Sequence, residues 1–383
     1  MTDCSHIPSP CYVLEEQKLV DNLELIDSVQ QRAGVTIILA LKGFAMFSVF
    51  PLIKKYLVGT TASSLWEAQL AREEFGGELH VYAPVYPEHE FDLILQGATH
   101  ISFNSLSQWQ RFRERSLAAG VSPGLRINLE YSPVEHDIYN PASPLSRLGI
   151  RAEVLTEKWG DRLPPGIEGL HCHNLCENNS YALETTLQQI EARFGRYLAQ
   201  VHWLNLGGGH LMTSMGYDVE HLVRVLQDFK TRHPHLKIYL EPGSAIAWQT
   251  GFLRATVLDV VKTAGPTIAM LDVSFTAHMP DCLEMPYKPK IRGARDPQPG
   301  EPTYRMGGTT CLAGDFMGMG DYCLTKPLHI GDTIVFEDMM HYTMVKTSMF
   351  NGVPHPAIGI IRLSGDFELV KTFGYLNYKN RLS

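Results

Sequence analysis

The sequence lacks the long apolar runs of membrane proteins. No stretch of its 383 residues approaches the run of about 18 apolar residues that marks a membrane-spanning helix. The N-terminal residues Met1–His6 contain no basic segment followed by an apolar one, so we expect no export signal. These absences predict a cytoplasmic protein without a membrane partner.

An excess of basic charge and a cysteine framework are lacking as well. Lys and Arg number 33 against 41 Asp and Glu, which gives a net charge of −8. This balance argues against a nucleic-acid partner, because phosphate binding relies on clustered basic side chains. It suits a small cationic substrate, although solubility alone also favours a mildly acidic chain. The seven cysteines are an odd number scattered from Cys4 to Cys323, unlike the pattern of a disulfide-stabilised secreted protein.

The composition is that of a folded chain with a substantial core. Hydrophobic residues make up 44% and charged residues 19%, and the length suggests two or three folding units. Short β-branched runs alternate with helical patterns through the first two-thirds. The candidate strands are Thr36–Leu41, Tyr56–Thr60, Leu79–Tyr82, His100–Phe103, Gly124–Asn128, Ile167–His173, His202–Leu206 and Lys237–Leu240. The amphipathic patterns between them include Leu65–Phe75, Ser105–Ala119, Tyr181–Gln200 and Val219–His233.

Eight strands, each followed by a helix or by room for one, are typical of a (β/α)₈ TIM barrel. An open doubly wound sheet is the rival architecture. After residue 250 the runs are short and β-like, with Pro/Gly-rich turns such as Arg292–Pro302 between them. We therefore predict a barrel over residues 18–250 and a second, mainly β domain over 1–17 and 251–383, in which Pro10–Leu14 supplies an N-terminal strand.

The predicted strands of the second domain follow the same logic of short apolar runs between turns. They are Gly251–Val261, Thr267–Val273, Thr303–Met306, Asp332–Glu337 and Ala357–Arg362.

Four polar features follow predicted barrel strands. Lys42 closes the first strand, and His171 and His173 end the sixth. The glycines Gly207–Gly209 follow the seventh strand, and Glu241 ends the eighth. Because the C-terminal ends of barrel strands form one rim, where active sites are built, we expect these groups to meet.

Each feature also has a simpler structural explanation. Lys42 could be a solvated strand end, the glycines a tight turn, and Glu241 the first carboxylate of a helix. His171, with Cys172 and Cys176, resembles a soft metal cluster. Alternate strand residues face opposite sides, however, so the two histidines would share a face that Cys172 does not.

Together the four features fit one cofactor. Pyridoxal 5′-phosphate needs a lysine for its aldehyde and an acidic partner for its ring nitrogen. It also needs a flat partner for its ring and a nest of backbone N–H groups for its phosphate. We therefore predict a pyridoxal-phosphate site at this rim.

The sequence resembles the fold-type III pyridoxal-phosphate decarboxylases, which include ornithine and diaminopimelate decarboxylases, over nearly its whole length. The similar segments of the first part are Pro10–Val13, Ala40–Lys42, Leu125–Ile127, Ser146–Gly149, His171–His173, Gly207–Gly209 and Glu241–Gly243. Those of the second part are Gly308–Cys311, Gly331–Asp332 and Phe336–Tyr342, with Cys311–Asp315 and Met349–Gly352 similar to the members that act on carboxylated polyamines. The resemblance implies a barrel with an added β domain, as in alanine racemase.

The resemblance also implies roles for single residues. Lys42 would attach the cofactor covalently, and His173 would stack on its ring. Glu241 would pair with the ring nitrogen, and Arg126 would lie near the ring. The phosphate contacts implied are those of Gly207, Gly208, Gly209 and the Tyr342 hydroxyl. Cys311 would return a proton to the substrate from across a dimer interface, so that a homodimer shares its active sites.

Departures from the family pattern concern the substrate. Diaminopimelate decarboxylases carry an arginine where this chain has Ser244, and that guanidinium can meet a distal carboxylate. Its loss suits a polyamine tail, and Asp272 and Asp315 could then bind ammonium groups. The family's Ile-Gly-Ser after the second histidine is also missing, since Asn174–Cys176 stands there.

The resemblance thus implies a carboxy-lyase of polyamine biosynthesis, which converts carboxynorspermidine, carboxyspermidine or both to norspermidine and spermidine. Alternatives on the same fold are a decarboxylase of diaminopimelate or another basic amino acid, and an amino-acid racemase. Alanine-type racemases place an arginine where this chain has Glu241. A non-enzymatic cofactor-binding protein would resemble a lone barrel, and a metal-dependent hydrolase would use His171 and His173.

Overall fold

A computed structural model describes residues 6–134 and 139–383. The chain divides into two compact units, Met1–Asp21 with Ala247–Ser383, and Asn22–Ile246. For the folding domains we keep the proposed boundaries after residues 17 and 250, which lie within a few residues of the limits of these compact units. Within the described ranges, no helix is both long and apolar enough to cross a bilayer.

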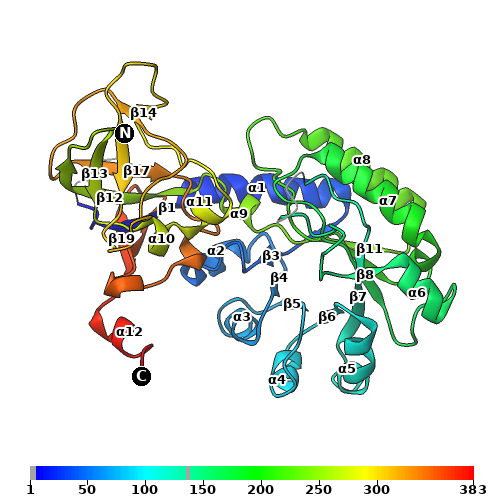
Figure 1. The fold of residues 1–383 in the computed structure, drawn as a ribbon. Coiled ribbons are helices and arrows are strands. Elements are labelled where there is room, and N and C mark those ends of the chain that lie inside the picture. The colour runs from blue at the N-terminus through cyan, green and yellow to red at the C-terminus, as the bar shows by residue number, and fades with distance from the viewer. Residues whose placement is uncertain (1–5, 135–138) are drawn as a thin grey trace. The chain divides into compact units, whose positions relative to one another are not determined.

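The unit Asn22–Ile246 contains a parallel sheet that curls on itself (Figure 1). Its strands are β2 (Thr36–Ile37), β3 (Leu39–Ala40), β4 (Gly59–Ala62), β5 (Glu78–Tyr82), β6 (His100–Phe103), β7 (Ser122–Asn128), β8 (Ile150–Arg151), β9 (Gly169–His171), β10 (Trp203–Asn205) and β11 (Lys237–Leu240). They are ordered β2-β11-β10-β9-β7-β6-β5-β4-β3, and β8 pairs with β7. Because β2 and β3 are successive pieces of one segment that pair with β11 and β4 respectively, this segment nearly closes the barrel. The predicted barrel is confirmed, and the open sheet is excluded.

Helices connect the barrel strands, and their boundaries follow local signals. The helices are α1 (Glu16–Ala33), α2 (Phe50–Ile53), α3 (Leu65–Leu70), α4 (Phe91–Leu95), α5 (Leu106–Ala118), α6 (Ala152–Trp159), α7 (Ser180–Leu198), α8 (Val219–Arg232) and α9 (Ser244–Ala247), with a 3₁₀ turn at Phe47–Val49 and a π-helical turn at Ala71–Phe75.

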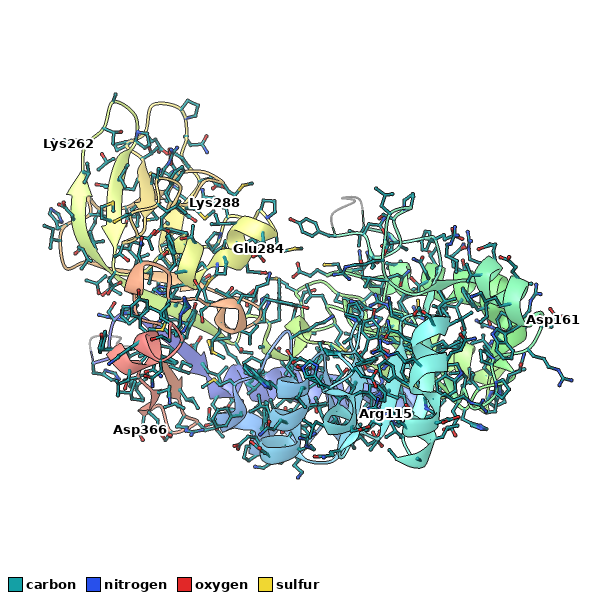
Figure 2. All side chains as sticks on the ribbon, turned by 60° about the horizontal axis from the view of Figure 1, so that its bottom comes forward. Arg115, Asp161, Lys262, Glu284, Lys288 and Asp366 are labelled. Atoms are coloured by element: carbon teal, nitrogen blue, oxygen red, sulfur yellow. The ribbon has the colours of Figure 1, made fainter. Side chains whose placement is uncertain are left out.

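Helix α5 shows how one such helix is specified. The Ser105 hydroxyl accepts a hydrogen bond from the Gln108 N–H at 3.2 Å and so caps the N-terminus. Trp109 and Phe112 are buried. Arg115, labelled in Figure 2, lies on the solvent side, where its Nε is 2.7 Å from Asp92 Oδ1. The apolar residues therefore anchor the helix in the core, while the charged ones stay in water.

Two predicted strands of the barrel need correction, and some elements were not predicted. The predicted strand Tyr56–Thr60 is Gly59–Ala62 instead. A side chain at Gly59 would place Cβ only 2.1 Å from the Glu78 carbonyl oxygen, so this glycine permits close strand pairing and does not end a strand. The predicted strand Ile167–His173 ends at His171, and the argument from alternating faces therefore does not reach His173. Helix α1 and the β8–α6 pair were not predicted.

The other unit is mainly β, as predicted. Its strands are β1 (Cys11–Glu15), β12 (Gly251–Val261), β13 (Thr267–Leu271), β14 (Ala294–Arg295), β15 (Tyr304–Gly307), β16 (Cys323–Leu324), β17 (Thr333–Glu337), β18 (Ala357–Ile361) and β19 (Phe367–Lys371). One sheet is ordered β15-β13-β12-β1-β18-β19, with β17 also pairing with β12, and β14 pairs with β16. Strand β1 lies between β12 and β18, so the predicted N-terminal strand is confirmed.

Short helices complete this unit. They are α10 (Phe275–His278), α11 (Pro280–Glu284), α12 (Tyr375–Lys379) and 3₁₀ turns at Met344–Lys346 and Phe350–Gly352.

Candidate active site

Lys42 lies in a tight turn directly after β3. The N–H of Gly43 donates to the Ala40 carbonyl at 3.0 Å. A Cβ atom at Gly43 would stand 2.7 Å from the Cα of Gly243, and the Ala40 N–H donates to the Pro242 carbonyl at 3.2 Å. The turn that carries Lys42 is therefore held against the turn that follows Glu241.

The amine of Lys42 is accessible and electrostatically perturbed. Its side chain is exposed to solvent, yet surrounding protein atoms reduce its hydration, and this desolvation is the main reason that its pKa is lowered. The positive charge of Arg126 lowers the pKa further, while Glu241 and Glu67 act in the opposite direction. A lowered pKa enlarges the fraction of neutral amine, the nucleophilic form.

His173 is fixed on the rim by two contacts. Its Nδ1 accepts a hydrogen bond from the Gly208 N–H at 2.9 Å, and its carbonyl accepts one from Arg126 Nη2 at 3.0 Å. Desolvation, followed by the charges of Lys42 and Arg126, holds the pKa of His173 well below its ordinary value. The ring is therefore neutral at physiological pH and has its orientation set by the glycine loop.

The glycine loop forms a cradle with no space for side chains. A Cβ at Gly207 would lie 2.5 Å from His173 Nδ1, and one at Gly208 would lie 2.5 Å from the Glu241 carbonyl oxygen. Two of its amides are already used, because Gly207 donates to Asn205 Oδ1 at 2.8 Å and Gly208 donates to His173. Of the three N–H groups that the sequence suggested for a phosphate, those of Gly207 and Gly208 are therefore already hydrogen-bonded within the protein. The N–H group of Gly209 is the third.

Glu241 is buried between an amide and two imidazoles. Its Oε1 accepts a hydrogen bond from Asn205 Nδ2 at 2.5 Å. His80 Nδ1 lies 3.9 Å from Oε1, and His171 Nε2 lies 3.8 Å from Oε2. Asn205 thereby connects the carboxylate to the glycine loop, since it also accepts from Gly207.

Arg126 is the buried cation of the rim. It projects from β7, and its guanidinium lies 4.5 Å from the centre of the Tyr82 ring, a distance typical of a cation–π contact. The same ring meets His171 edge-on at 5.1 Å. Tyr82 therefore contacts both Arg126 and His171.

The chemistry of the donors speaks against a metal held by the two histidines. His173 Nδ1 already accepts a hydrogen bond from Gly208. Burial raises the pKa of Cys172 to about 12, so this sulfur is a thiol, whereas metal ligation needs a thiolate. The metal-hydrolase alternative thus lacks a suitable donor set at this position.

Several neighbours of these groups were missed by sequence reasoning. Asn205 and His80 are polar residues inside apolar strands, and that contrast was the available signal. Glu67 is the third residue of α3, where its Oε2 accepts a hydrogen bond from the Ser63 N–H at 2.7 Å. Burial raises its pKa, while Lys42 acts to lower it.

Two predicted substrate ligands are already bound within the β unit. Asp315 Oδ1 accepts hydrogen bonds from the N–H groups of Phe275 (2.7 Å) and Thr276 (3.2 Å). Its Oδ2 accepts from the Thr310 N–H (3.0 Å) and hydroxyl (2.6 Å). Asp272 accepts from Ser9 Oγ at 2.6 Å and from the Thr256 N–H at 2.8 Å. Both carboxylates therefore stabilise their own unit, and their binding of ammonium groups stays a prediction.

Cys311 and Tyr342 also belong to the β unit. Cys311 is exposed, and its N–H donates to Asn351 Oδ1 at 2.9 Å. This bond joins the two sequence segments, around Cys311 and around Met349, that had suggested a polyamine enzyme. Tyr342 is half-buried and has a φ of 46°.

The remaining predicted site residue, Ser244, lies in the barrel unit, where it begins α9.

Comparison with known proteins identifies the family. The family model for the pyridoxal-dependent decarboxylases, C-terminal sheet domain, matches residues 11–340. The chain is 59% identical to the carboxyaminopropylagmatine decarboxylase of Synechocystis sp., over 99% of this chain and 96% of that protein. It is 41% identical to the carboxynorspermidine/carboxyspermidine decarboxylase of Campylobacter jejuni, over 98% of each. The crystal structure of the C. jejuni carboxynorspermidine decarboxylase with norspermidine superimposes with a TM-score of 0.89 at 40% identity, covering 98% of this chain and 100% of that one.

These likenesses define an enzyme of the fold-type III class. The chain belongs to the pyridoxal-dependent decarboxylase family, and its cofactor is pyridoxal 5′-phosphate. The predicted class of enzyme and the predicted cofactor are confirmed.

The barrel residues fit this cofactor. The glycine loop leaves a space that any Cβ would fill, as close approach of a phosphate requires. His171 is buried with neither ring nitrogen hydrogen-bonded within the described residues, and a bound polar group could satisfy such atoms. The neutral ring of His173, the accessible amine of Lys42 and the buried carboxylate of Glu241 are groups of the kinds that the remaining contacts would need.

Proposed function

We propose that the protein decarboxylates a carboxylated polyamine, with carboxyaminopropylagmatine as its principal substrate. The observation that carries this proposal is the 59% identity over 99% of the chain to an enzyme of that name. The carboxynorspermidine/carboxyspermidine enzymes are less similar, at 41% and 38%. All of these substrate names describe a polyamine with an added carboxyl group. They differ in the tail, because agmatine ends in a guanidinium, whereas norspermidine and spermidine end in an ammonium.

Carboxynorspermidine and carboxyspermidine, the substrates expected from the sequence, form the second candidate. The norspermidine complex with a TM-score of 0.89 favours them. Ser244 is consistent with both candidates, because neither substrate carries the distal carboxylate that an arginine at this position could bind. Asp272 and Asp315 already accept hydrogen bonds inside their own unit, so we infer that further groups join them in contacting the cationic tail.

We assign the chemistry of the barrel as follows. Pyridoxal phosphate, when bound, accepts the electron pair released as carbon dioxide leaves. Lys42 would hold the cofactor aldehyde covalently and later release the product amine. His173 would stack on the ring with its neutral imidazole. Glu241 would keep a proton at the ring nitrogen. Arg126 would hold His173 in place through its hydrogen bond to the His173 carbonyl.

The phosphate contacts are proposed for the glycine loop and Tyr342. Gly207 and Gly208 would contribute chiefly space, and Gly209 an N–H group. The Tyr342 hydroxyl would donate a further hydrogen bond. Cys311 would return a proton to Cα of the substrate.

We further propose a homodimer with shared active sites in the cytoplasm. The family resemblance supports a Cys311 that serves the partner's Lys42, and the exposure of this thiol agrees with such a role. None of the six described cysteines forms a disulfide, which agrees with a reducing compartment.

The assignment is tested by measuring carbon dioxide release from purified holoenzyme. We expect kcat/KM for carboxyaminopropylagmatine to exceed that for carboxyspermidine and carboxynorspermidine by about tenfold or more. The reverse order would select the second candidate. Turnover of diaminopimelate or ornithine alone, or inversion of an amino acid without gas release, would contradict the proposal.

A further inference from the structure

His80 occupies an unusual place in the barrel, between two carboxylates. It lies on β5 and is 3% exposed. Its Nδ1 is 3.9 Å from Oε1 of Glu241, and its Nε2 is 3.6 Å from Oε2 of Glu78. These separations are those of ion pairs and exceed hydrogen-bond lengths, so the ring is positioned between its partners with room to tighten.

Glu78 is a fixed partner on the far side of this ring. Lys237 Nζ donates to its Oε1 at 3.0 Å, and the Tyr239 hydroxyl donates to its Oε2 at 3.0 Å. The contact with His80 is the largest of the causes that lower the pKa of Glu78 to about 2. Glu78 is therefore an anion at physiological pH, and its negative charge lies at a fixed position beside the His80 ring.

The two ring nitrogens of His80 thus both face carboxylates. A neutral imidazole has one donor and one acceptor nitrogen, and only the doubly protonated ring donates to both sides. The ring therefore lies between a partly exposed carboxylate, Glu78, and a buried one, Glu241, and can orient the second through the first. The remaining partner of Glu241 Oε1 is the neutral amide of Asn205, which orients the group without supplying charge.

We propose that His80 is a positioning residue that holds Glu241 in the orientation required opposite the cofactor's ring nitrogen, and that Glu78 orients His80 in turn. This inference rests on the role of Glu241 in the proposed function. His80 touches neither substrate nor cofactor in this account, because it acts through Glu241 alone.

Glu78, His80 and His100 also lie close enough to be considered as metal ligands. The rings of His80 and His100 are stacked, however, with centroids 4.0 Å apart and planes 26° from parallel, an arrangement in which the rings pack against each other. Glu78 is already bonded to Lys237, whose positive charge opposes a cation there. The positioning role accounts for the arrangement better.

The test uses three variants at position 80 and its neighbour. His80→Asn keeps an amide donor near the place of Nδ1 and can still reach Glu241, whereas His80→Leu removes both donors. Each is compared in the wild-type and Glu241→Ala backgrounds. His100→Asn is the matched control, because it disturbs the same stacked pair without a contact to Glu241.

The measurements are the dissociation constant of pyridoxal phosphate for the apoprotein, kcat and KM of the holoenzyme, and the Tm of the apoprotein. We expect His80→Leu to weaken cofactor binding and to lower kcat by about tenfold, as loss of an outer-shell partner typically does, with KM unchanged. His80→Asn should recover most of both losses. In the Glu241→Ala background His80→Leu should have no further effect.

A His80→Leu variant that binds the cofactor normally while Glu241→Ala does not would overturn the inference and leave the proposed function intact. Full additivity of the two changes, or an equal loss in His100→Asn, would overturn it too. An unimpaired Glu241→Ala would instead remove the role of Glu241 on which it rests. Should His80→Leu fail to fold, Glu78→Gln supplies the same test from the other side of the ring, with the same expected direction.

Discussion

Gly43 and Gly243 meet through their backbones, so that a Cβ on Gly43 would stand 2.7 Å from the Cα of Gly243. This contact joins the turn after the first barrel strand to the turn after the last. It thereby fixes the distance between the segment that carries Lys42 and the segment that carries Glu241. The two groups that we propose to act on opposite parts of one cofactor are thus linked by a contact that only glycine permits.

Gly43→Ala should therefore disturb both stability and cofactor binding. The added methyl group meets backbone, which cannot rotate away, and overpacking of this kind costs about 1–3 kcal/mol. Urea unfolding of the apoprotein and titration with pyridoxal phosphate measure the two effects. Gly195→Ala is the control, because the helix α7 leaves space there and alanine is the better helix former. Equal behaviour of the two variants would contradict the argument.

Asp315→Asn should affect stability far more than substrate affinity. The carboxylate accepts four hydrogen bonds from Phe275, Thr276 and Thr310, and an amide turns a donor toward some of these donors. Leaving a buried group unsatisfied costs about 1–3 kcal/mol. We expect a lower free energy of unfolding and little change in KM.

The control for this change is Asp161→Asn, whose carboxylate is exposed and pairs with Arg196 at the surface (Figure 2). Such pairs contribute at most about 1 kcal/mol. A large rise in KM for Asp315→Asn, with unfolding unchanged, would restore the substrate-binding role predicted from the sequence.

The amine of Lys42 should capture the cofactor at lower pH than an ordinary lysine. Its pKa is lowered from the usual 10.5, so the neutral amine is more abundant at any given pH. The rate at which the apoprotein binds pyridoxal phosphate should rise with pH, with a midpoint below 10.5. Arg126→Gln removes one cause of the shift and should move this midpoint upward.

Arg126→Lys is the matched variant for that experiment, because it keeps the positive charge while changing the geometry. Its midpoint should stay closer to that of the wild type than the midpoint of Arg126→Gln. If both variants move alike, the charge of Arg126 is not the cause.

Cys311→Ala should lower kcat by about 10²–10⁴-fold if the thiol is the general acid. A shared active site adds a sharper test. Mixing inactive Lys42→Ala and Cys311→Ala proteins, with subunit exchange, should restore activity to about a quarter of the wild type, since half of the dimers then contain one intact site. Cys323→Ala, at a buried thiol of the same unit, is the control and should keep its activity without mixing. No recovery on mixing would contradict shared sites.

The rim could be predicted from the sequence because its rule is local. A residue that ends a parallel strand lies at the rim regardless of packing details, which placed Lys42, His173, Gly207–Gly209 and Glu241 correctly in the same unit. Helix α1 could have been predicted too, since Leu19, Leu23 and Ile26 follow helical spacing.

Other features depend on contacts between distant segments. The His80–Glu241 and Gly43–Gly243 pairs join residues far apart in the chain, and no local pattern marks one member as the partner of the other. The hydrogen bonds of Asp315 could not be predicted for the same reason. The sequence around Asp315 shows an acidic residue in a loop. Only the fold shows that the N–H groups of Phe275 and Thr276 donate hydrogen bonds to its carboxylate.

The most direct test of the account is reduction of the holoenzyme with borohydride, followed by peptide mapping. The account predicts a yellow protein whose absorbance changes on reduction, with the reduced pyridoxyl group on the peptide that contains Lys42. A Lys42→Ala protein should still bind the cofactor, but borohydride should not attach the pyridoxyl group to it covalently. A colourless protein, or a label on any other lysine, would contradict the account.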